Sequence, residues 1–214
     1  MTLESSFPIV SVVAAVAAGV VIGRPAPRAI RALKVCAIAA LALFAYFRQI
    51  APTEIPVALV LGAIAEVVTP AAARRWAVVD TMFRAAGWVV FAYLFLRIGE
   101  GRAAFLGDAV KAAMLVGLLV GAGFGLARLW PLLGRSRRPV GLEAAALSMM
   151  VIAALTLYWS FWPAMAGAAG VMASEGLMIA AVFTGRPADS LQVRRGAWAL
   201  SYLGQAAMAY AFLR

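Results

Sequence analysis

The sequence contains no histidine, and its 214 residues include a single cysteine, Cys36, inside an apolar run. The lack of histidine excludes histidine-ligated metal centres, Ser-His-Asp triads and Cys-His pairs. A single cysteine excludes an intrachain disulfide and a Cys-x-x-Cys metal site, and we expect no disulfide-linked partner. Any chemistry must therefore depend on carboxylates, hydroxyls, lysine, arginine, amides or water, and we expect no metal and no other cofactor.

Acidic residues are also scarce, since nine Asp and Glu stand against 19 Lys and Arg, for a net charge of +10. The basic residues fall in short clusters between apolar runs, without a basic arm or aromatic-basic interleaving, so we expect no nucleic-acid partner. Apolar residues are in excess: hydrophobic residues make up 65% of the chain and the mean hydropathy is +0.94. A typical soluble domain is about 45–50% apolar, so this composition predicts a polytopic membrane protein.

A transmembrane helix needs about 20 apolar residues, in a range of about 17–25. The first apolar run lacks the basic start of a signal peptide, carrying Glu4 instead, and Gly-Arg-Pro follows it, so we interpret it as a membrane helix. We predict an all-α polytopic membrane protein with eight transmembrane helices in one domain, residues 1–214. The eight predicted spans are residues 7–23, 29–47, 54–70, 76–97, 105–127, 139–158, 163–183 and 195–213.

The connections on the two sides of the predicted bundle differ in their basic residues. Those after the first, third, fifth and seventh spans hold 12 of them: Arg24, Arg28, Arg31, Arg74, Arg75, Arg128, Arg135, Arg137, Arg138, Arg186, Arg194 and Arg195. The opposite side holds 5: Arg48, Arg97, Arg102, Lys111 and Arg214. Because basic connections stay in the cytoplasm, we expect a multi-pass protein of the cell inner membrane with both termini outside the cytoplasm.

The two halves of the chain repeat some polar positions. Glu66 and Glu175 are 109 residues apart, and so are Lys34 and Glu143. Four helices in each half would keep the two copies in the same membrane orientation. The pattern therefore predicts a four-plus-four parallel repeat with halves 1–102 and 103–214.

Three glycines, Gly117, Gly121 and Gly125, recur at four-residue spacing in the fifth predicted helix. Small residues at this spacing let helix backbones approach closely. We therefore expect these glycines to pack against a neighbouring helix.

Six ionisable residues within the predicted helices are candidates for a function, because a charge at mid-bilayer costs at least about 2.5–3.5 kcal/mol. Two of them, Asp80 and Arg84, are four residues apart, the spacing of an intrahelical ion pair. The predicted orientation places all six in the cytoplasmic half of the membrane, so we expect a polar cavity that opens toward the cytoplasmic leaflet. The six are Lys34, Glu66, Asp80, Arg84, Glu143 and Glu175.

The depth of the other four residues separates them into two pairs. Lys34 and Glu143 lie about one turn inside the interface, where they either snorkel to it or serve a site. Glu66 and Glu175 are too deep for a short side chain to reach the interface, which favours a function for both.

Three segments of the second half match a known pattern in order and spacing: RRPVGLEAAALSMM at 137–150, GAAGVMASEGLMIAAVF at 167–183 and SYLGQ at 201–205. In these segments the chain resembles the YhhN-like family of integral membrane proteins, whose characterised members are lysoplasmalogenases. In the first half, Lys34 stands where the family has a Lys and Glu66 where it has a Gly-Asp. The matching residues of the second half are Gly167, Ala168, Ser174, Phe183, Tyr202, Leu203 and Gln205.

The chain departs from the family pattern at three places. Glu66 and Glu175 replace two aspartates, which keeps the acid and lengthens each side chain by one methylene. Ala86-Gly87 stands where the family has Ala-His, so a polar group is missing there. Glu143 replaces a Tyr and adds a third carboxylate.

The resemblance implies that a lysophospholipid enters from the cytoplasmic leaflet and that its sn-1 vinyl ether is hydrolysed to a fatty aldehyde and a glycerophospho-alcohol. Glu66 and Glu175 would be the acid-base pair, without an assignment of which is the acid. Two other interpretations stay open, a small proton-coupled transporter and a non-catalytic lysolipid-binding protein. The residues expected to bind substrate are Lys34 and Arg84 for the phosphate, Tyr202 and Gln205 for water or the ether oxygen unless they serve as interhelical contacts, and Ser174 and Glu143 beside them.

Overall fold

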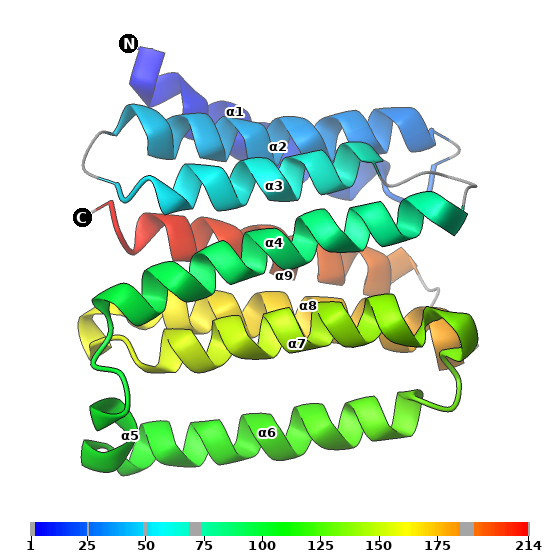
Figure 1. Ribbon diagram of the computed structural model, residues 1–214. Coiled ribbons are helices and arrows are strands. Elements are labelled where there is room, and N and C mark those ends of the chain that lie inside the picture. Colours follow the sequence, from blue (N-terminus) through cyan, green and yellow to red (C-terminus); the bar gives the residue numbers. More distant parts are fainter. Residues whose placement is uncertain (1–2, 25, 49–50, 69–73, 185–190, 214) are drawn as a thin grey trace.

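The computed structural model describes residues 3–24, 26–48, 51–68, 74–184 and 191–213, and this part of the chain is helical without a strand. It confirms the all-α class, and Figure 1 shows the long helices side by side. The α-helices are α1 Leu3–Val21, α2 Pro27–Phe47, α3 Glu54–Val68, α4 Arg74–Ile98, α5 Ala103–Gly107, α6 Ala109–Leu129, α7 Arg137–Leu155, α8 Trp162–Thr184 and α9 Leu191–Tyr210, with 3-10 turns at Gly134–Ser136 and Trp159–Phe161.

Some residues used in the predictions lie outside the described part of the chain. Arg186 and Arg214 do so entirely. For Glu4, Arg74, Arg75 and Phe183 only the backbone is described, so nothing is said of their side chains.

Five of the described segments are long and apolar enough to cross a membrane, namely Pro27–Phe47, Val78–Ile98, Ala109–Leu129, Gly134–Leu155 and Trp159–Ala181. A shorter apolar helix runs over Ser6–Val21. Large apolar side chains are exposed on the outer faces of the bundle, as with Val13 at 61% and Leu203 at 62%. Lipid is a favourable environment for such faces, so the helices are compatible with a multi-pass membrane protein.

Seven of the long helices form a ring of neighbours. Each helix in the order α1, α2, α3, α4, α7, α8, α9 contacts the next one. Helix α9 then closes the ring by contacting α1 and α2. Large side chains such as Phe91, Phe95 and Met150 fill its interior. The eighth long helix, α6, lies outside the ring at the lower edge of Figure 1.

Helices α8 and α9 approach each other closely at Gly167 and Gly204. A Cβ atom added at Gly167 would collide with the carbonyl oxygen of Gly204, and one added at Gly204 would lie 2.6 Å from the carbonyl oxygen of Gly167. The two backbones can touch only because neither residue has a side chain.

The prediction that Gly117, Gly121 and Gly125 pack against a neighbouring helix is wrong. A Cβ atom added at any of them would meet no described atom within 4 Å. The reason is the position of α6, which makes few contacts with α7 and α8 along its length. Close packing of a small-residue face requires a second helix at that face, and α6 has none there.

The prediction of one continuous helix over residues 105–127 is also wrong, because the chain turns at Asp108. Its backbone is extended, with φ −134° and ψ 104°, between the end of α5 and the start of α6. The Asp108 side chain accepts hydrogen bonds from the backbone N–H groups of Val110 at 2.9 Å and Lys111 at 3.2 Å, which caps α6. The Trp159 indole N–H also donates to it, and these donors hold the pKa of Asp108 below its usual range.

The same corner contains a buried lysine. Lys111 Nζ donates to the carbonyl oxygen of Leu157 at 2.6 Å and lies 3.3 Å from Glu100 Oε2. Leu157 and Trp159 belong to the turn between α7 and α8. The first turn of α6 is therefore fastened to that turn, while the rest of α6 is not buried against the ring.

Candidate functional site

A polar cavity of about 280 Å³ lies inside the ring, with walls from α2, α3, α4, α7, α8 and α9. It is in the half of the bundle where α2, α4, α7 and α9 begin, on the right of Figure 1. The polar residues that line it are Lys34, Glu66, Arg84, Glu143, Ser174, Glu175, Arg194 and Ser201.

Arg84 is the centre of the charged cluster. Its Nη2 donates to Asp80 Oδ2 at 2.8 Å, one turn earlier in α4. Its Nε lies 3.5 Å from Glu143 Oε1 on α7, and its Nη1 lies 3.6 Å from Glu175 Oε1 on α8. A guanidinium has five N–H donors in a fixed plane, so one arginine can pair with three carboxylates from three helices.

Glu175 therefore has a cation opposite it, although no basic residue lies near it in the sequence. The carboxylate comes from the middle of α8 and the guanidinium from the first half of α4. The sequence spacing predicted the pair of Asp80 with Arg84, and the structure adds Glu143 and Glu175 to the same cation.

A second ion pair lies across the cavity. Lys34 Nζ on α2 is 3.7 Å from Glu66 Oε2 on α3, and it lies 4.7 Å above the ring of Trp198. The amine is thus directed toward a carboxylate and an aromatic face of the cavity. The Trp198 indole N–H donates to the carbonyl oxygen of Ala15 at 3.1 Å, which fixes the ring against α1.

The cluster contains more acids than cations. Lys34 and Arg84 pair with four carboxyl groups, those of Glu66, Asp80, Glu143 and Glu175. A further cationic residue, Arg194, is exposed and also lines the cavity. The carboxyl groups around this cavity therefore outnumber the two cations that they pair with.

Arg84 and Lys34 have N–H donors that make no short hydrogen bond to the three glutamates around them. The separations of 3.5–3.7 Å to the three glutamates exceed the usual hydrogen-bond length of about 2.7–3.2 Å. Among the described residues, Glu143 Oε1 is buried and has no hydrogen-bond partner. Arg84 Nε and Nη1, Lys34 Nζ and this oxygen can therefore bind a polar ligand while the hydrogen bond from Arg84 Nη2 to Asp80 stays in place.

The other predicted site residues lie at different places. Ser174 lines the cavity, but its hydroxyl donates to the carbonyl oxygen of Ala197 at 2.7 Å and so joins α8 to α9. Tyr202 pairs with the Ser11 hydroxyl at 2.7 Å, and Ser11 donates its own proton to the Ala37 carbonyl, so Tyr202 is the donor of that pair.

Gln205 is likewise engaged in a contact between side chains, since its amide donates to Ser201 Oγ at 3.3 Å. Neither Tyr202 nor Gln205 is among the described residues that line the cavity. Of the two roles expected for Tyr202, the structure gives it the interhelical contact, which joins α9 to α1 and α2.

Besides apolar residues, three cavity residues with a charge, an aromatic ring or a hydroxyl were not predicted: Arg194, Trp198 and Ser201. They lie four and three residues apart in α9, which places them on one helical face. That spacing could have revealed a polar stripe in an otherwise apolar helix. Among the described residues, no group of three or more His, Cys, Asp or Glu side chains is arranged to hold a metal ion.

Comparison of the chain with protein-family models, curated proteins and solved structures found no match. The resemblance to YhhN-like proteins therefore depends on the quoted segments alone and stays a prediction.

Proposed function

We propose that the protein is a membrane-embedded hydrolase that cleaves the sn-1 vinyl ether of a lysoplasmalogen to a fatty aldehyde and a glycerophospho-alcohol. The observation that carries this proposal is the cluster of Glu66, Glu143 and Glu175 around Lys34 and Arg84, inside a bundle whose outer faces are apolar. The cluster offers an acid and a base side by side, and the apolar exterior would admit a lipid substrate.

The reaction needs only these groups and water. A protonated carboxyl transfers its proton to the β-carbon of the vinyl ether, which leaves an oxocarbenium ion. An ionised carboxylate stabilises this cation and accepts a proton from the water that attacks it. The resulting hemiacetal then collapses: its hydroxyl returns a proton to the first carboxylate, the second carboxyl group protonates the glycerol oxygen, and the bond from carbon to that oxygen breaks, which releases the aldehyde and the alcohol.

Glu66 and Glu175 are the proposed acid-base pair. Each faces a cation, Lys34 and Arg84 respectively, at a distance longer than a hydrogen bond. These cations are the proposed partners of the substrate phosphate, because a phosphate oxygen could approach them within hydrogen-bond distance. Glu143 shares Arg84 with Glu175 and belongs to the same binding region.

The proposal includes eight membrane crossings in the cell inner membrane, with both termini outside the cytoplasm. Eight long helices overlap the eight predicted spans, and five of the described segments are long and apolar enough to cross a membrane. The polar cavity lies in the half of the bundle that the basic connections assign to the cytoplasm. This position also disfavours a transporter, which requires access from both faces.

A four-plus-four repeat fits the contacts between helices. In such a repeat α4 corresponds to α9 and α7 corresponds to α2. The contact of α4 with α7 then has its counterpart in the contact of α9 with α2; both are present, and the α4–α7 contact is far more extensive. The equivalent pairs Lys34 and Glu143, and Glu66 and Glu175, line one cavity, as residues around a shared axis would.

The test is aldehyde release from a vinyl-ether lysophospholipid by the purified, detergent-solubilised protein. Loss of a general acid or base lowers the rate of an enzymatic reaction by about 10²–10⁴-fold. We therefore expect Glu175→Gln to lower the rate of aldehyde release at least about 100-fold. Glu54→Gln is the matched control, because Glu54 pairs with Arg97 at the start of α3, away from the cavity. An ester-linked lysolipid should stay intact.

Two results would contradict the hydrolase. One is no aldehyde from folded wild-type protein between about pH 5 and 8, the range in which folded proteins are usually most stable. The other is equal rates for Glu175→Gln and Glu54→Gln. Binding of the lysolipid without aldehyde release would identify a non-catalytic lipid-binding protein.

A further inference from the structure

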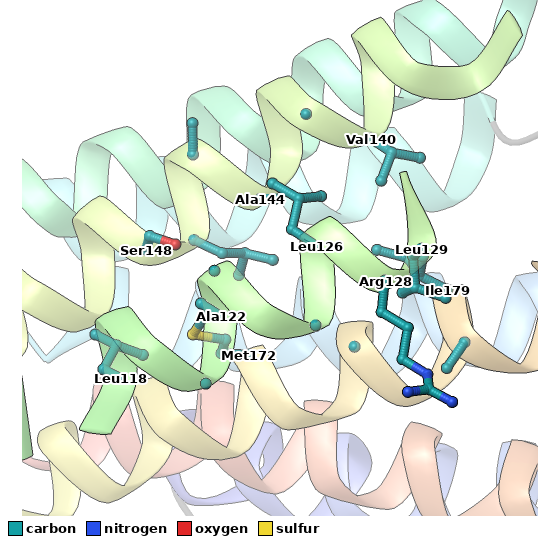
Figure 2. Close-up of a pocket in the computed structure, with 18 of the residues that line it drawn as sticks. Leu118, Ala122, Leu126, Arg128, Leu129, Val140, Ala144, Ser148, Met172 and Ile179 are labelled. Atoms are coloured by element: carbon teal, nitrogen blue, oxygen red, sulfur yellow. The ribbon is translucent and has the colours of Figure 1, made fainter. Parts of the chain in front are cut away.

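A second, larger cavity of about 960 Å³ lies between α6 on one side and α7 and α8 on the other (Figure 2). We call it the α6 groove, and its walls include Leu118 and Leu126 of α6, Ala144 of α7, and Met172 and Ile179 of α8. Its size is at the upper end of the range of about 300–1,000 Å³ for small-molecule sites. Its lining is apolar except for Ser148 and Arg128, and Arg128 belongs to the last turn of α6.

The α6 groove adjoins the polar cavity. Ile179 lines both cavities. On α8, Glu175 lines the polar cavity and the next residue, Gly176, lines the groove. On α7, Glu143 lines the polar cavity and the next residue, Ala144, lines the groove. The two cavities are therefore neighbours that meet at Ile179, and an elongated molecule lying past Ile179 would reach from one into the other.

Space in the groove comes from the position of α6. In the other half of the chain, the corresponding helix α1 packs closely along α2, whereas α6 makes few contacts with α7. Four glycines line the groove without a near neighbour, since a Cβ atom at Gly121, Gly123, Gly125 or Gly176 would meet nothing described within 4 Å. The Asp108 and Lys111 contacts hold α6 at its first turn and leave the groove open along the helix.

We propose that the α6 groove binds the hydrocarbon chain of a single-chain lipid whose polar end lies in the cavity around Arg84. The polar cavity is small and charged and the adjoining groove is large and apolar, which matches the two ends of a lysophospholipid. This inference rests on the proposed function in taking a lysolipid as the substrate, and it concerns binding, which can be measured without turnover.

Glycine substitutions give a matched test. Gly121→Leu would place a side chain in the groove, and Gly117→Leu would place the same side chain one turn earlier on α6, at a residue that does not line it. Both positions have open space around a Cβ atom, so neither substitution should disturb the fold. Gly176→Leu would fill the groove from α8, the opposite wall, at a position equally open.

The probe is a saturated 1-O-alkyl lysophosphoethanolamine with a photoreactive diazirine near the end of its chain. The saturated ether has no vinyl bond to cleave, so labelling reports binding alone. In nanodiscs of diacyl phosphatidylcholine, we expect adducts on α6 and α7 groove residues that excess unlabelled lysolipid removes. A leucine side chain in the groove would compete with the lipid chain for the same space. We therefore expect about tenfold weaker labelling in Gly121→Leu and Gly176→Leu, and labelling at the wild-type level in Gly117→Leu.

Equal labelling of Gly121→Leu and Gly117→Leu would overturn the inference. So would adducts spread over outer-face residues such as Val13 and Val16, which indicate contact with bulk lipid. The two proposals fail separately. Groove labelling without aldehyde release contradicts only the hydrolase, and aldehyde release with no effect of Gly121→Leu on labelling contradicts only the groove.

Discussion

At the scale of the residue, one side chain organises the charges of the bundle. Arg84 pairs with Asp80, Glu143 and Glu175, and Lys34 pairs with Glu66 beside them. Ion pairs inside a protein do not stabilise strongly by themselves, but removal of one partner leaves the others uncompensated. Substitution of Arg84 alone would therefore leave three carboxyl groups without their cation, so we expect it to lower stability more than other single substitutions in the cluster.

We expect Arg84→Met to lower the free energy of unfolding by about 3–5 kcal/mol, as loss of one partner of a buried ion pair does. Arg84→Lys should lose less, because lysine keeps the charge but has three donors in place of five. The measurement is thermal unfolding in detergent. Arg97→Met is the control, since its side chain is 48% exposed and its pair with Glu54 should contribute about 0–1 kcal/mol. Equal melting temperatures for Arg84→Met and Arg97→Met would contradict this account.

At the scale of the element, the helices differ in how they use glycine. Gly167 and Gly204 bring α8 and α9 into backbone contact, and the neighbouring Ser174 hydroxyl bonds to α9 at the Ala197 carbonyl. This contact fixes Glu175 on α8 relative to Trp198 on α9, on two walls of the polar cavity. The glycines of α6 have the opposite effect, since they leave space beside the helix.

Gly167→Ala should separate α8 from α9, because its methyl group would collide with the carbonyl oxygen of Gly204. Overpacking of this kind costs about 1–3 kcal/mol of unfolding free energy. Gly196→Ala on α9 is the matched control, because a Cβ atom there has open space and alanine favours a helix by up to about 1 kcal/mol over glycine. Thermal unfolding of the two variants should move in opposite directions, and a stabilising Gly167→Ala would refute the close contact.

The sequence also contained a signal for the break between α5 and α6 that the prediction passed over. Gly107 followed by Asp108, directly before an apolar helix, is a typical end of one helix and cap of the next. The apolar content on both sides of Asp108 favoured a single span instead. Hydrophobicity alone does not register a one-residue turn, because the turn changes a backbone angle and not the average composition.

At the scale of the whole molecule, the proposed orientation places the connection between α6 and α7 in the cytoplasm and the turn between α7 and α8 outside. Arg135 is exposed in the first connection and Ser160 in the second. The chain has a single cysteine, Cys36, which is exposed and can be replaced by serine to give a cysteine-free background.

In that background we expect Ser160→Cys to react with a membrane-impermeant maleimide applied to intact spheroplasts. Arg135→Cys should react only after the membrane is permeabilised, because a basic connection is held in the cytoplasm. The degree of labelling is read by mass shift on a gel. The reverse pattern would place the polar cavity in the outer half of the membrane and remove access from the cytoplasmic leaflet.

The sequence by itself determined the all-α class of this protein and, apart from the break at Asp108, the approximate positions of its long helices. Both depend on local composition, since about 20 apolar residues between Pro, Gly and Arg make a helix suited to lipid wherever they occur. It also determined the pairing of Asp80 with Arg84, which are one turn apart on the same helix. These are properties of neighbours along the chain.

Only the tertiary structure decided which helices meet. Glu143 and Glu175 pair with the same arginine, and Tyr202 forms a hydrogen bond with Ser11. Helices α8 and α9 contact each other at Gly167, whereas Gly121 lies beside a groove. The physical reason is that spacing within a helix shows which residues share a face, whereas the partner of that face depends on how all the helices fill space together.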